Sequence, residues 1–417
     1  MDNPRRAPNI TGMAQPDTDI LIVGGGLNGP CLALACAQAG LRSVVLDALP
    51  VDTRSGDTFD GRAYALALAS VRMLDALGLW DEIADHAQPI LEIKASDGRA
   101  GEGAAPFFLH FDHAEIEEGP MGHMLEDRYL RRALLDAMEA ETLVTHRPGT
   151  RVVGQGVGSV TLEGGEVLIA RLLVGADGRR SGVAERAGIK RMGWGYDQTA
   201  LVCAVDHEKP HNGIAHQFFM PGGPLAILPL PGNRSSIVWS ESELRAGELA
   251  AADDETFLAA LRPAFGDFLG EISLSGARFS YPLGLSLAQG FIAERLALVG
   301  DAAHGVHPIA GQGLNLGLRD VGALAEVLAD AKRRGEDIAA SNVLARYQQW
   351  RRFDTAALAV GTDAVNRLFS NDNGALRAIR DLGMGAITAL PGLRRGFIRE
   401  AAGLTGDLPR LMQGRAL

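Results

Sequence analysis

A strand, a turn, a helix and a second strand near the start of the chain limit its fold more than any other feature. Residues 19–23 (DILIV) form an apolar run typical of a buried parallel strand. The turn after it has the spacing Gly24-x-Gly26-x-x-Gly29, and a helical pattern leads to a second strand over 43–46 that ends at Asp47. Such glycines permit a tight turn, let a pyrophosphate approach the backbone and let helix and strand pack closely. The acid is placed to bind ribose hydroxyls, so the segment predicts a Rossmann-type domain for an ADP-containing cofactor.

The size and charge of the chain limit the number of domains and the classes of partner that are expected. Its 417 residues exceed what one hydrophobic core usually serves, so two domains are expected. Lys and Arg number 40 against 51 Asp and Glu, a net charge of −11, which argues against nucleic acid as the main partner. The three cysteines form no CxxC pair and are interpreted as buried apolar residues in a reducing compartment. No metal site is predicted.

Two features near the start resemble targeting signals but are interpreted otherwise. The uncharged run over 20–41 is broken by Gly24-Gly25-Gly26 and by Gly29-Pro30, so it predicts a strand, turn and helix rather than a membrane span. Asp17 and Asp19 separate Arg5-Arg6 from this run, which argues against a twin-arginine signal. A cytoplasmic protein with a disordered tail over 1–18 is expected.

A second glycine-rich segment, residues 295–320, predicts a ligand-binding loop. A buried strand over 296–299 breaks at Gly300-Asp301, and a loop leads from there into a helix. The aspartate can accept hydrogen bonds from hydroxyls, and the first-turn N–H groups of the helix can face an electron-rich ligand edge. Gly311 and Gly313 would let the backbone approach a flat ligand.

The middle of the chain predicts a second, mixed sheet. A buried strand over 172–178 ends in Asp177-Gly178, beside basic residues, which suits contact with a cofactor or nucleotide. From about 190 to 281, apolar runs between Pro-Gly turns predict strands of a separate sheet that would roof the cofactor. Four of its apolar residues either line a pocket or form plain core: Phe218, Phe219, Leu228 and Trp239.

The expected organisation is therefore α/β, with a Rossmann-type domain interleaved with a mixed-sheet substrate domain and a helical C-terminus. The cofactor domain is expected over 19–80, 120–189 and 282–360, the substrate domain over 81–119 and 190–281, and the tail over 361–417. Residues 367–417 hold eight arginines and four acids, a net charge of +4. This tail either rests on an anionic membrane surface or a partner, or packs on the cofactor domain with solvated arginines.

Several short motifs occur at separate places along the chain. They are Asp60-x-Arg62, Glu126-Asp127-Arg128, Gly175-Ala176-Asp177-Gly178-Arg179-x-Ser181, Leu228-Pro229-Leu230-Pro231, Tyr281-Pro282-Leu283, and His307-Pro308-Ile309-Ala310-Gly311-Gln312-Gly313-Leu314-Asn315. With the two glycine-rich segments, this set resembles the flavin-dependent aromatic hydroxylases, and most closely their ubiquinone-biosynthesis branch. The resemblance covers roughly residues 19–360. Asp127 is a departure, because the family more often has Asn there.

The resemblance implies FAD as cofactor, NAD(P)H as co-substrate and a set of residues that bind FAD. The glycine turn and Asp47 would hold its ADP half, Arg62 and Arg128 its middle, and Asp301 its ribityl chain. Asp177 would touch the pyrophosphate region and NAD(P)H. The implied cofactor-binding residues are Gly24, Gly26, Leu27, Asn28, Gly29, Asp47, Arg62, Arg128, Asp177, Gly300, Asp301, Pro308, Gly311, Gly313, Leu314 and Asn315. No catalytic side chain is assigned, and His304 and His307 are interpreted either as structural or as residues that support those in contact with the cofactor.

The implied activity is hydroxylation of the aromatic ring of a polyprenylated phenol in ubiquinone biosynthesis, through a C4a-hydroperoxyflavin. O₂ and the phenol are the expected partners, with a quinone-biosynthesis complex and peripheral contact with the inner face of the membrane as further expectations. Two alternatives stay open: another flavin oxidoreductase, such as a polyprenyl reductase, and a flavoprotein scaffold without turnover. The sequence does not distinguish the ring carbon, NADH from NADPH, or the oligomeric state.

Overall fold

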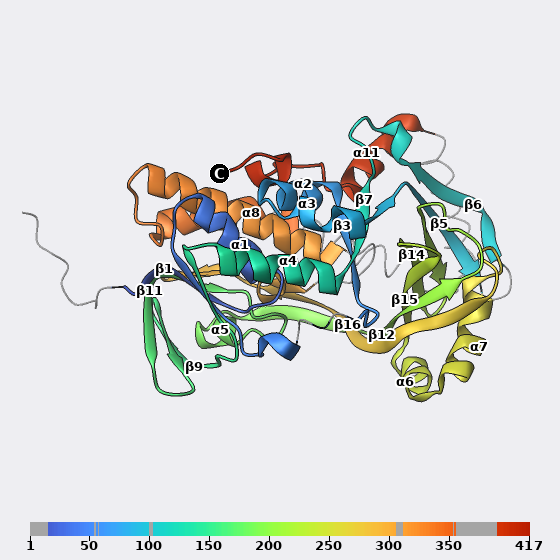
Figure 1. Cartoon of the computed structure of the whole chain (residues 1–417), viewed down its shortest axis with the longest axis horizontal. Coiled ribbons are helices and arrows are strands. Elements are labelled where there is room, and N and C mark those ends of the chain that lie inside the picture. Colours follow the sequence, from blue (N-terminus) through green and yellow to red (C-terminus); the bar gives the residue numbers. More distant parts are fainter. Residues whose placement is uncertain are drawn as a thin grey trace, which may run out of the picture.

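The structure, a computed structural model, describes residues 16–53, 56, 58–99, 103–305, 312–352, 354–355 and 390–417. Two of the predicted cofactor-binding residues, Pro308 and Gly311, lie outside these ranges. The strands of the described residues form two eight-stranded sheets and a three-stranded sheet. One large sheet lies with β1 and β11 at one end of the molecule, and the other lies with β5 and β6 at the opposite end (Figure 1).

The first large sheet has the parallel core of a Rossmann-type domain. Its path is β17-β18-β11-β1-β2-β8, and β10 and β9 extend from β11 as an antiparallel hairpin. The pairs β1–β2, β1–β11, β2–β8 and β11–β18 are parallel. The strands are β1 (Thr18–Val23), β2 (Ser43–Leu46), β8 (Val144–Arg147), β9 (Val152–Gly156), β10 (Ser159–Leu162), β11 (Val167–Gly175), β17 (Ile292–Ala293) and β18 (Leu296–Leu298).

The continuous apolar run of β1 is explained by its position in the middle of this sheet. Ile20, Leu21 and Ile22 are fully buried, since helices cover the strand. The strand begins at Thr18, and the Asp17 carboxylate accepts a hydrogen bond from the backbone N–H of Ile169. Asp17 and Thr18 are therefore part of the ordered domain, although the sequence placed them in the disordered tail.

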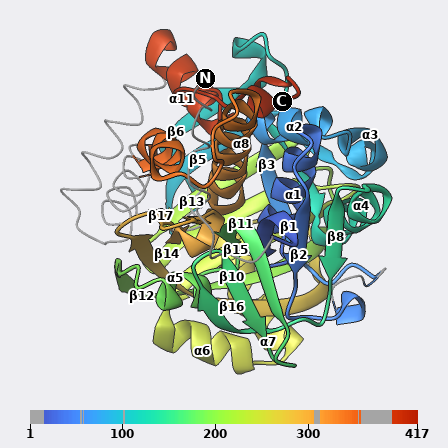
Figure 2. The same ribbon diagram turned by 90° about the vertical axis from the view of Figure 1, so that its left-hand side faces the viewer.

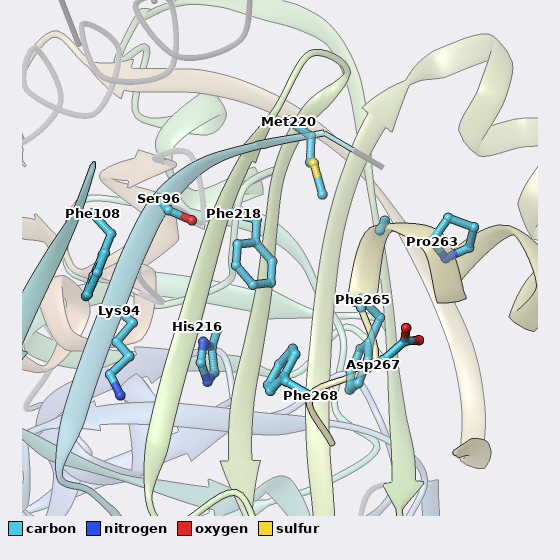
Figure 3. A pocket seen from close by; sticks show the side chains of 12 residues that line it. Lys94, Ser96, Phe108, His216, Phe218, Met220, Pro263, Phe265, Asp267 and Phe268 are labelled. Carbon is cyan, nitrogen blue, oxygen red and sulfur yellow. The ribbon is translucent and has the colours of Figure 1, made fainter. Parts of the chain in front are cut away.

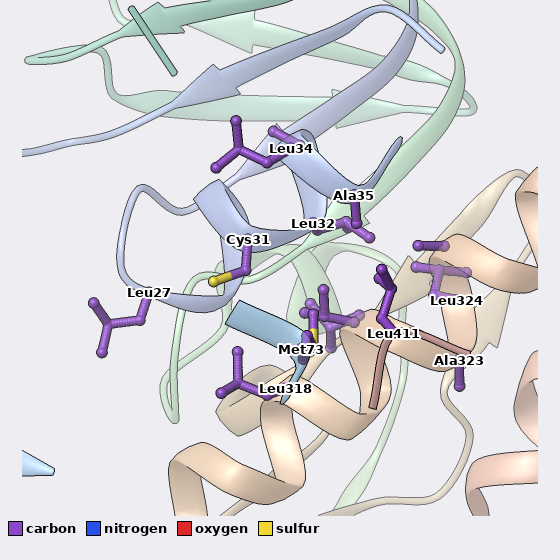
Figure 4. Close-up of a cluster of buried hydrophobic side chains, with 14 of the residues drawn as sticks. Leu27, Cys31, Leu32, Leu34, Ala35, Met73, Leu318, Ala323, Leu324 and Leu411 are labelled. Atoms are coloured by element: carbon purple, nitrogen blue, oxygen red, sulfur yellow. The ribbon is translucent and has the colours of Figure 1, made fainter. Parts of the chain in front are cut away.

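Three helices form the layer over the sheet. They are α1 (Asn28–Gln38), α4 (Asp127–Ala140) and α8 (Gln312–Arg333). In Figure 2, α4 and α8 lie on either side of α1, and α1 contacts both. Figure 4 shows the junction of α1 and α8, where Cys31 and Leu32 of α1 meet Leu318 and Leu324 of α8. Cys31, Cys36 and Cys203 are all buried, as predicted, and burial raises the pKa of each thiol to about 12.

The second large sheet is mixed, as predicted. Its order is β19-β16-β12-β15-β14-β13-β5-β6, in which only β13 and β5 run parallel. Two helices, α6 (Glu243–Ala251) and α7 (Asp254–Phe265), cover one face. The strands are β5 (Glu92–Arg99), β6 (Gly103–Asp112), β12 (Arg191–His207), β13 (Ile214–Met220), β14 (Gly223–Leu230), β15 (Arg234–Ser242), β16 (Ile272–Ala288) and β19 (His304–Gly305).

The alternation of side chains divides this sheet into an outer face under α6 and α7 and an inner face toward the first domain. Phe218 and Trp239 belong to the outer cluster that contains Phe257 of α7. Leu228, by contrast, packs against the core of the first domain. Phe218 and Trp239 are therefore core of the outer face and cannot line a pocket beneath the inner face.

The small sheet and the tail complete the fold. β3 (Ala63–Ala67) and β4 (Gln88–Ile90) flank β7 (Gly122–Glu126), and α2 (Leu68–Ala76) and α3 (Trp80–Ile83) follow β3 in sequence. In the tail, α11 (Pro391–Ala401) packs beside β6, and a 3-10 turn over Arg410–Gln413 packs against α2 and α8.

Ion pairs fix much of the tail to the rest of the protein. Arg394 pairs with Glu115 at 2.7 Å, and Arg399 pairs with Glu118. Arg410 pairs with Glu326 and Asp330 of α8. These pairs favour the packed arrangement for part of the tail's positive charge. Within the described ranges, every helix is too short or too polar to cross a membrane.

Candidate active site

The turn between β1 and α1 leaves no room for side chains at two of its glycines. Gly24 has a φ of +122°, and a Cβ there would lie 2.2 Å from the carbonyl oxygen of Ala176. A Cβ on Gly29 would lie 2.0 Å from the carbonyl oxygen of Gly24. The backbone of the turn is thus packed directly against the end of β11, and the start of α1 follows at once.

Asp47 faces this turn from the end of β2. It is 5% exposed, and its Oδ1 accepts a hydrogen bond of 3.0 Å from the backbone N–H of Leu49. A Cβ on Gly25 would lie 2.4 Å from Asp47 Oδ2, so the carboxylate and the turn are in close contact. This is where the sequence pattern predicted an acid for ribose hydroxyls.

A small cavity of about 10 Å³, room for about one water molecule, lies between the turn and α4, and an arginine that the sequence motifs did not indicate lines it. Gly25, Gly26, Asp47 and Arg131 all border this cavity. Arg131 is 7% exposed, and its Nη1 is buried without a hydrogen-bond partner among the described residues. A buried cationic donor beside a glycine turn matches the needs of a phosphate. The only sequence signal was its position among the three arginines of α4's first turns.

Asp127, the family departure, holds Arg131 in place. Its carboxylate accepts hydrogen bonds of 3.0 and 2.7 Å from Arg131 and one of 2.8 Å from the Tyr64 hydroxyl. Arg62 Nη2 lies 3.5 Å away and also pairs with Asp60 at 2.6 Å. Although burial alone would raise the pKa of Asp127, the hydrogen bonds and charge of Arg131 hold it below its usual value.

The other predicted arginine, Arg128, points away from this network. Its Nε donates to Glu126 at 2.7 Å, and its guanidinium lies 4.5 Å from the centre of the Tyr129 ring. Arg62 and Arg128 are therefore both already paired with a carboxylate of the protein. Of the arginines near the glycine turn, Arg131 has the buried donor left over for a ligand.

Asp177 follows β11 and caps the short helix α5 (Gly182–Arg186). Its carboxylate accepts from the Ser181 hydroxyl at 2.5 Å and from the Val183 N–H at 3.0 Å. Its backbone lies against Gly24, since a Cβ on that glycine would be 2.9 Å from Asp177 N. The structure thus brings the residue to the turn but shows its carboxylate engaged within its own loop.

The Gly300-Asp301 turn lies beside the start of α1. A Cβ on Gly300 would be 2.2 Å from Nδ2 of Asn28, and one on Gly317 of α8 would be 2.5 Å from the same atom. Asn28 Oδ1 is buried with no partner in the described part of the chain. The Asp301 carboxylate is half-exposed and lies 3.5 Å from Arg179 Nε. The two glycine-rich segments therefore meet at one place, as the sequence led us to expect.

A buried polar network fixes that turn from behind. Asp320 of α8 accepts hydrogen bonds from Gly300 N at 2.9 Å, His304 Nε2 at 2.5 Å and Arg351 Nε at 2.8 Å. Asp320, Arg351 and the His304 side chain are fully buried. Burial would raise the pKa of Asp320, but the charges and hydrogen bonds of His304 and Arg351 keep it below its usual value. His304 therefore helps to hold the Gly300-Asp301 turn in place.

The same turn is also fixed to the second sheet. β19 pairs with β16, so His304 and Gly305 are in register with Leu287 and Ser286. Arg191 of β12 donates to the carbonyl oxygens of Asp301, at 3.2 Å, and of Ala302. No sequence motif pointed to Arg191, because its role depends on a contact between residues more than a hundred positions apart.

The N-terminus of α8 points at the region between the two domains. Gly313, Leu314 and Asn315 occupy its first turn, where backbone N–H groups have no partner within the helix. The Asn315 side chain bonds to Ala65 O, Ala67 N and the Ser70 hydroxyl, each at 2.8 Å. This side chain therefore bonds the helix to β3 and α2. The backbone N–H groups of the first turn of α8 are then left available for a ligand there.

These segments bring together the groups that a dinucleotide-binding site needs. The glycine turn, Asp47 and the spare donor of Arg131 suit an ADP half, and the α8 terminus and Asp301 lie beside the same turn. Over the α8 terminus, Leu285 of β16 packs on Leu316, with Tyr196 and Leu287 beside them. The second sheet thus places apolar side chains above the site.

The family profile and the relatives show that this fold and this site belong to a flavin-dependent monooxygenase. The solved structure of p-nitrophenol 4-monooxygenase PnpA from Pseudomonas putida matches with a TM-score of 0.77 at 22% identity, covering 94% of this chain and 100% of that one. The profile of the family described as "FAD binding domain" matches residues 17–360.

Two relatives carry the comparison further. The chain is 47% identical to ubiquinone hydroxylase UbiL of Rhodospirillum rubrum, over 99% of this chain and 96% of the relative. It is 37% identical to 3-demethoxyubiquinol 3-hydroxylase of Escherichia coli, over 94% and 100%. The chain belongs to the family of FAD-dependent ubiquinone-biosynthesis hydroxylases. The predictions of family, enzyme class and FAD are confirmed, and NAD(P)H is the usual co-substrate of this family.

Proposed function

We propose that this enzyme uses NAD(P)H and O₂ to hydroxylate the aromatic ring of a polyprenylated phenol on the route to ubiquinone. The names of its relatives support this substrate class, and the match to UbiL extends through the second sheet as well as the cofactor domain. The structural observation that carries the proposal is the position of the Gly300-Asp301 turn between the two domains. The chain just after this turn pairs with the second sheet, and Leu285 of that sheet packs over the start of α8.

The binding roles of individual residues are part of the proposal. The turn over 24–29 and Asp47 would hold the adenosine and pyrophosphate of FAD, with Arg131 Nη1 as the phosphate donor. Arg62 would reach the middle of the cofactor while paired with Asp60, and Asp301 would accept from the ribityl hydroxyls. The orphaned Oδ1 of Asn28, buried beside Gly300, supports a further polar contact there.

The protein's part in the chemistry is binding, orientation and exclusion of water. Bound FAD supplies the redox chemistry, taking electrons from NAD(P)H and activating O₂. The first-turn N–H groups of α8 at Gly313 and Leu314 favour negative charge nearby, by about 0.3–2 kcal/mol for a helix terminus. Leu285 and Leu316 keep water from the same place. The reaction needs no nucleophilic side chain.

The direct test uses purified, FAD-loaded protein with NAD(P)H and short-chain prenylphenols under air. We expect substrate-stimulated NAD(P)H oxidation, O₂ uptake and a product heavier by one oxygen atom. NAD(P)H oxidation without a hydroxylated ring in any such phenol would contradict the proposal. The lipid extract of a strain lacking the gene should contain the accumulated precursor, and its structure identifies the ring carbon.

The same assay separates the two alternatives. A polyprenyl reductase would oxidise NAD(P)H without O₂ uptake, which an oxygen electrode detects. A scaffold in a quinone-biosynthesis complex would show slow flavin bleaching with NAD(P)H, or none, whatever phenol is added.

Peripheral contact with an anionic membrane through the C-terminal tail is a further part of the proposal. Leu390, Leu393 and Phe397 are 51%, 52% and 46% exposed, at the spacing of one helical face. The test is sedimentation with phosphatidylglycerol vesicles. Phe397→Ser should reduce binding, and Leu244→Ser, at an exposed leucine of α6, should not. Equal sedimentation of both variants with wild type would contradict a role for this face.

A further inference from the structure

A second cavity lies on the outer face of the mixed sheet, away from the cofactor. Its volume is about 350 Å³, within the range of small-molecule sites, which begins at about 300 Å³. Most of its lining is apolar and aromatic, and the polar exceptions are few (Figure 3). The lining residues are Lys94, Ser96, Phe108, His216, Phe218, Met220, Pro263, Ala264, Phe265, Gly266, Asp267 and Phe268.

Strand register explains the floor of this cavity. Ser96 of β5 is in register with Phe218 of β13 on one side and with Phe108 of β6 on the other. In the next row, Lys94 is in register with His216. Because side chains alternate along a strand, these residues share the outer face with Phe218, whose neighbours pack under α7. The inner face, which packs toward the first domain, lies on the other side of the sheet.

The end of α7 forms the wall. Gly266 has a φ of +83° and ends the helix, so the chain turns and carries Phe268 over the strands. The Phe268 ring lies 4.5 Å from the His216 ring and 5.5 Å from the Phe265 ring, centre to centre. Phe268 is still 38% exposed, so it forms a rim rather than a closed cover.

The polar groups of the cavity indicate an uncharged ligand. The lining holds one charged side chain of each sign, Lys94, which is ion-paired with Glu92 at 3.1 Å, and Asp267, so neither an anion nor a cation is favoured. Burial lowers the pKa of His216 to about 4, with Lys94 adding to the effect, so the imidazole is neutral at physiological pH. Ser96 is 2% exposed, and its Oγ has no hydrogen-bond partner among the described residues. In Figure 3 this hydroxyl lies between Phe108 and Phe218.

A buried hydroxyl without a partner is unfavourable unless a ligand or water completes it. We propose that this cavity is a second binding site, separate from the catalytic one, for a neutral amphiphile with an apolar body and a single hydroxyl or carbonyl. The apolar body would lie among Phe108, Phe218 and Phe268, and its polar group would bond to Ser96 Oγ. Phenols, quinones and long-chain alcohols share this chemistry. The site does not depend on which phenol the enzyme hydroxylates.

The test uses the FAD-loaded full-length protein, with N-phenyl-1-naphthylamine as a neutral fluorescent probe. We expect saturable binding of the probe, displaced by 4-hexylphenol, without the change in flavin absorbance that occupancy of the catalytic site would cause. Ala264→Phe fills the cavity and should weaken probe binding at least tenfold. Ser96→Ala should weaken 4-hexylphenol about three- to tenfold, the net effect of one hydrogen bond, and leave hexylbenzene unchanged.

Two further variants keep the test decisive. Phe268→Ala removes part of the rim and should weaken the probe severalfold even if Ala264→Phe fails to fold with FAD. Leu244→Ala, at a leucine of α6 that is 79% exposed, is the matched control and should bind as wild type. Absence of saturable binding, or binding that neither cavity variant weakens, would overturn the site. If the anion decanoate binds more tightly than 4-hexylphenol, the claim that the cavity prefers an uncharged ligand is wrong.

Discussion

The buried carboxylate of Asp320 offers the sharpest test of how the Gly300-Asp301 turn is held. Asp320→Asn keeps the size of the side chain but removes its charge and replaces one acceptor oxygen by a donor. In wild type, one oxygen serves Gly300 N and His304 Nε2, and the other serves Arg351 Nε. An asparagine therefore cannot satisfy both sides of the network.

The expected loss of folding stability follows from the burial of the ion pair. Arg351 is fully buried, and breaking a buried ion pair by removing one partner costs about 3–5 kcal/mol. Arg351 keeps a second partner, Asp354 at 2.8 Å, so we expect about 3 kcal/mol. The Gly300 turn also loses its anchor, so FAD affinity should fall at least tenfold, which corresponds to about 1.4 kcal/mol.

Chemical denaturation of the apoprotein and calorimetric titration with FAD measure the two effects. Asp330→Asn is the matched control, since Asp330 lies on the same helix, is paired with arginines and is partly exposed; it should cost less than about 1 kcal/mol. The double variant Asp320→Asn/Arg351→Met should be less destabilised than the two single variants predict by addition. An Asp320→Asn protein with wild-type stability and FAD affinity would refute the assigned role of the network.

Three other predictions concern the turn and α4. Arg131→Met should weaken FAD and free ADP at least tenfold by calorimetry, whereas Arg132→Met, an exposed neighbour, should change neither more than about twofold. Gly24→Ala should yield protein without bound flavin, since a methyl group would lie 2.2 Å from a carbonyl oxygen; a normally yellow variant contradicts this. Because the folded pKa of Asp127 is lowered, its stabilisation is fully present above its unfolded pKa of about 3.9 and is lost as pH falls below that value. The difference in melting temperature between wild type and Asp127→Asn should therefore be largest near pH 6–7 and shrink below about pH 4, and a difference independent of pH would argue against the ion pair.

Local patterns were sufficient to predict the parts of the site that depend on short stretches of chain. The turn over 24–29, the strand before it and the acid at Asp47 belong to one βαβ unit, whose geometry is set by its own glycines and apolar run. The break at Gly300-Asp301 was visible for the same reason. The helix expected after this break is α8, which begins at Gln312.

Contacts between distant residues could not be predicted in the same way. The Asn315 side chain is bonded to residues about 250 positions earlier, so its structural role needed the fold. The choice between Phe218 and Leu228 as inner-face residues depended on register, which a run of apolar residues does not specify. Arg131 was overlooked because neighbouring arginines on a helix look alike until their partners are known.

The double attachment of the Gly300-Asp301 turn has a mechanical consequence. One side of it is bonded to Asp320 in the cofactor domain, and the other is paired with β16 and held at two carbonyls by Arg191. A displacement of the second sheet would therefore also displace this turn, because both domains are bonded to it. Under the proposed role of Asp301 in binding the cofactor, a bulky substrate that shifts the second sheet would also shift a residue that holds the flavin.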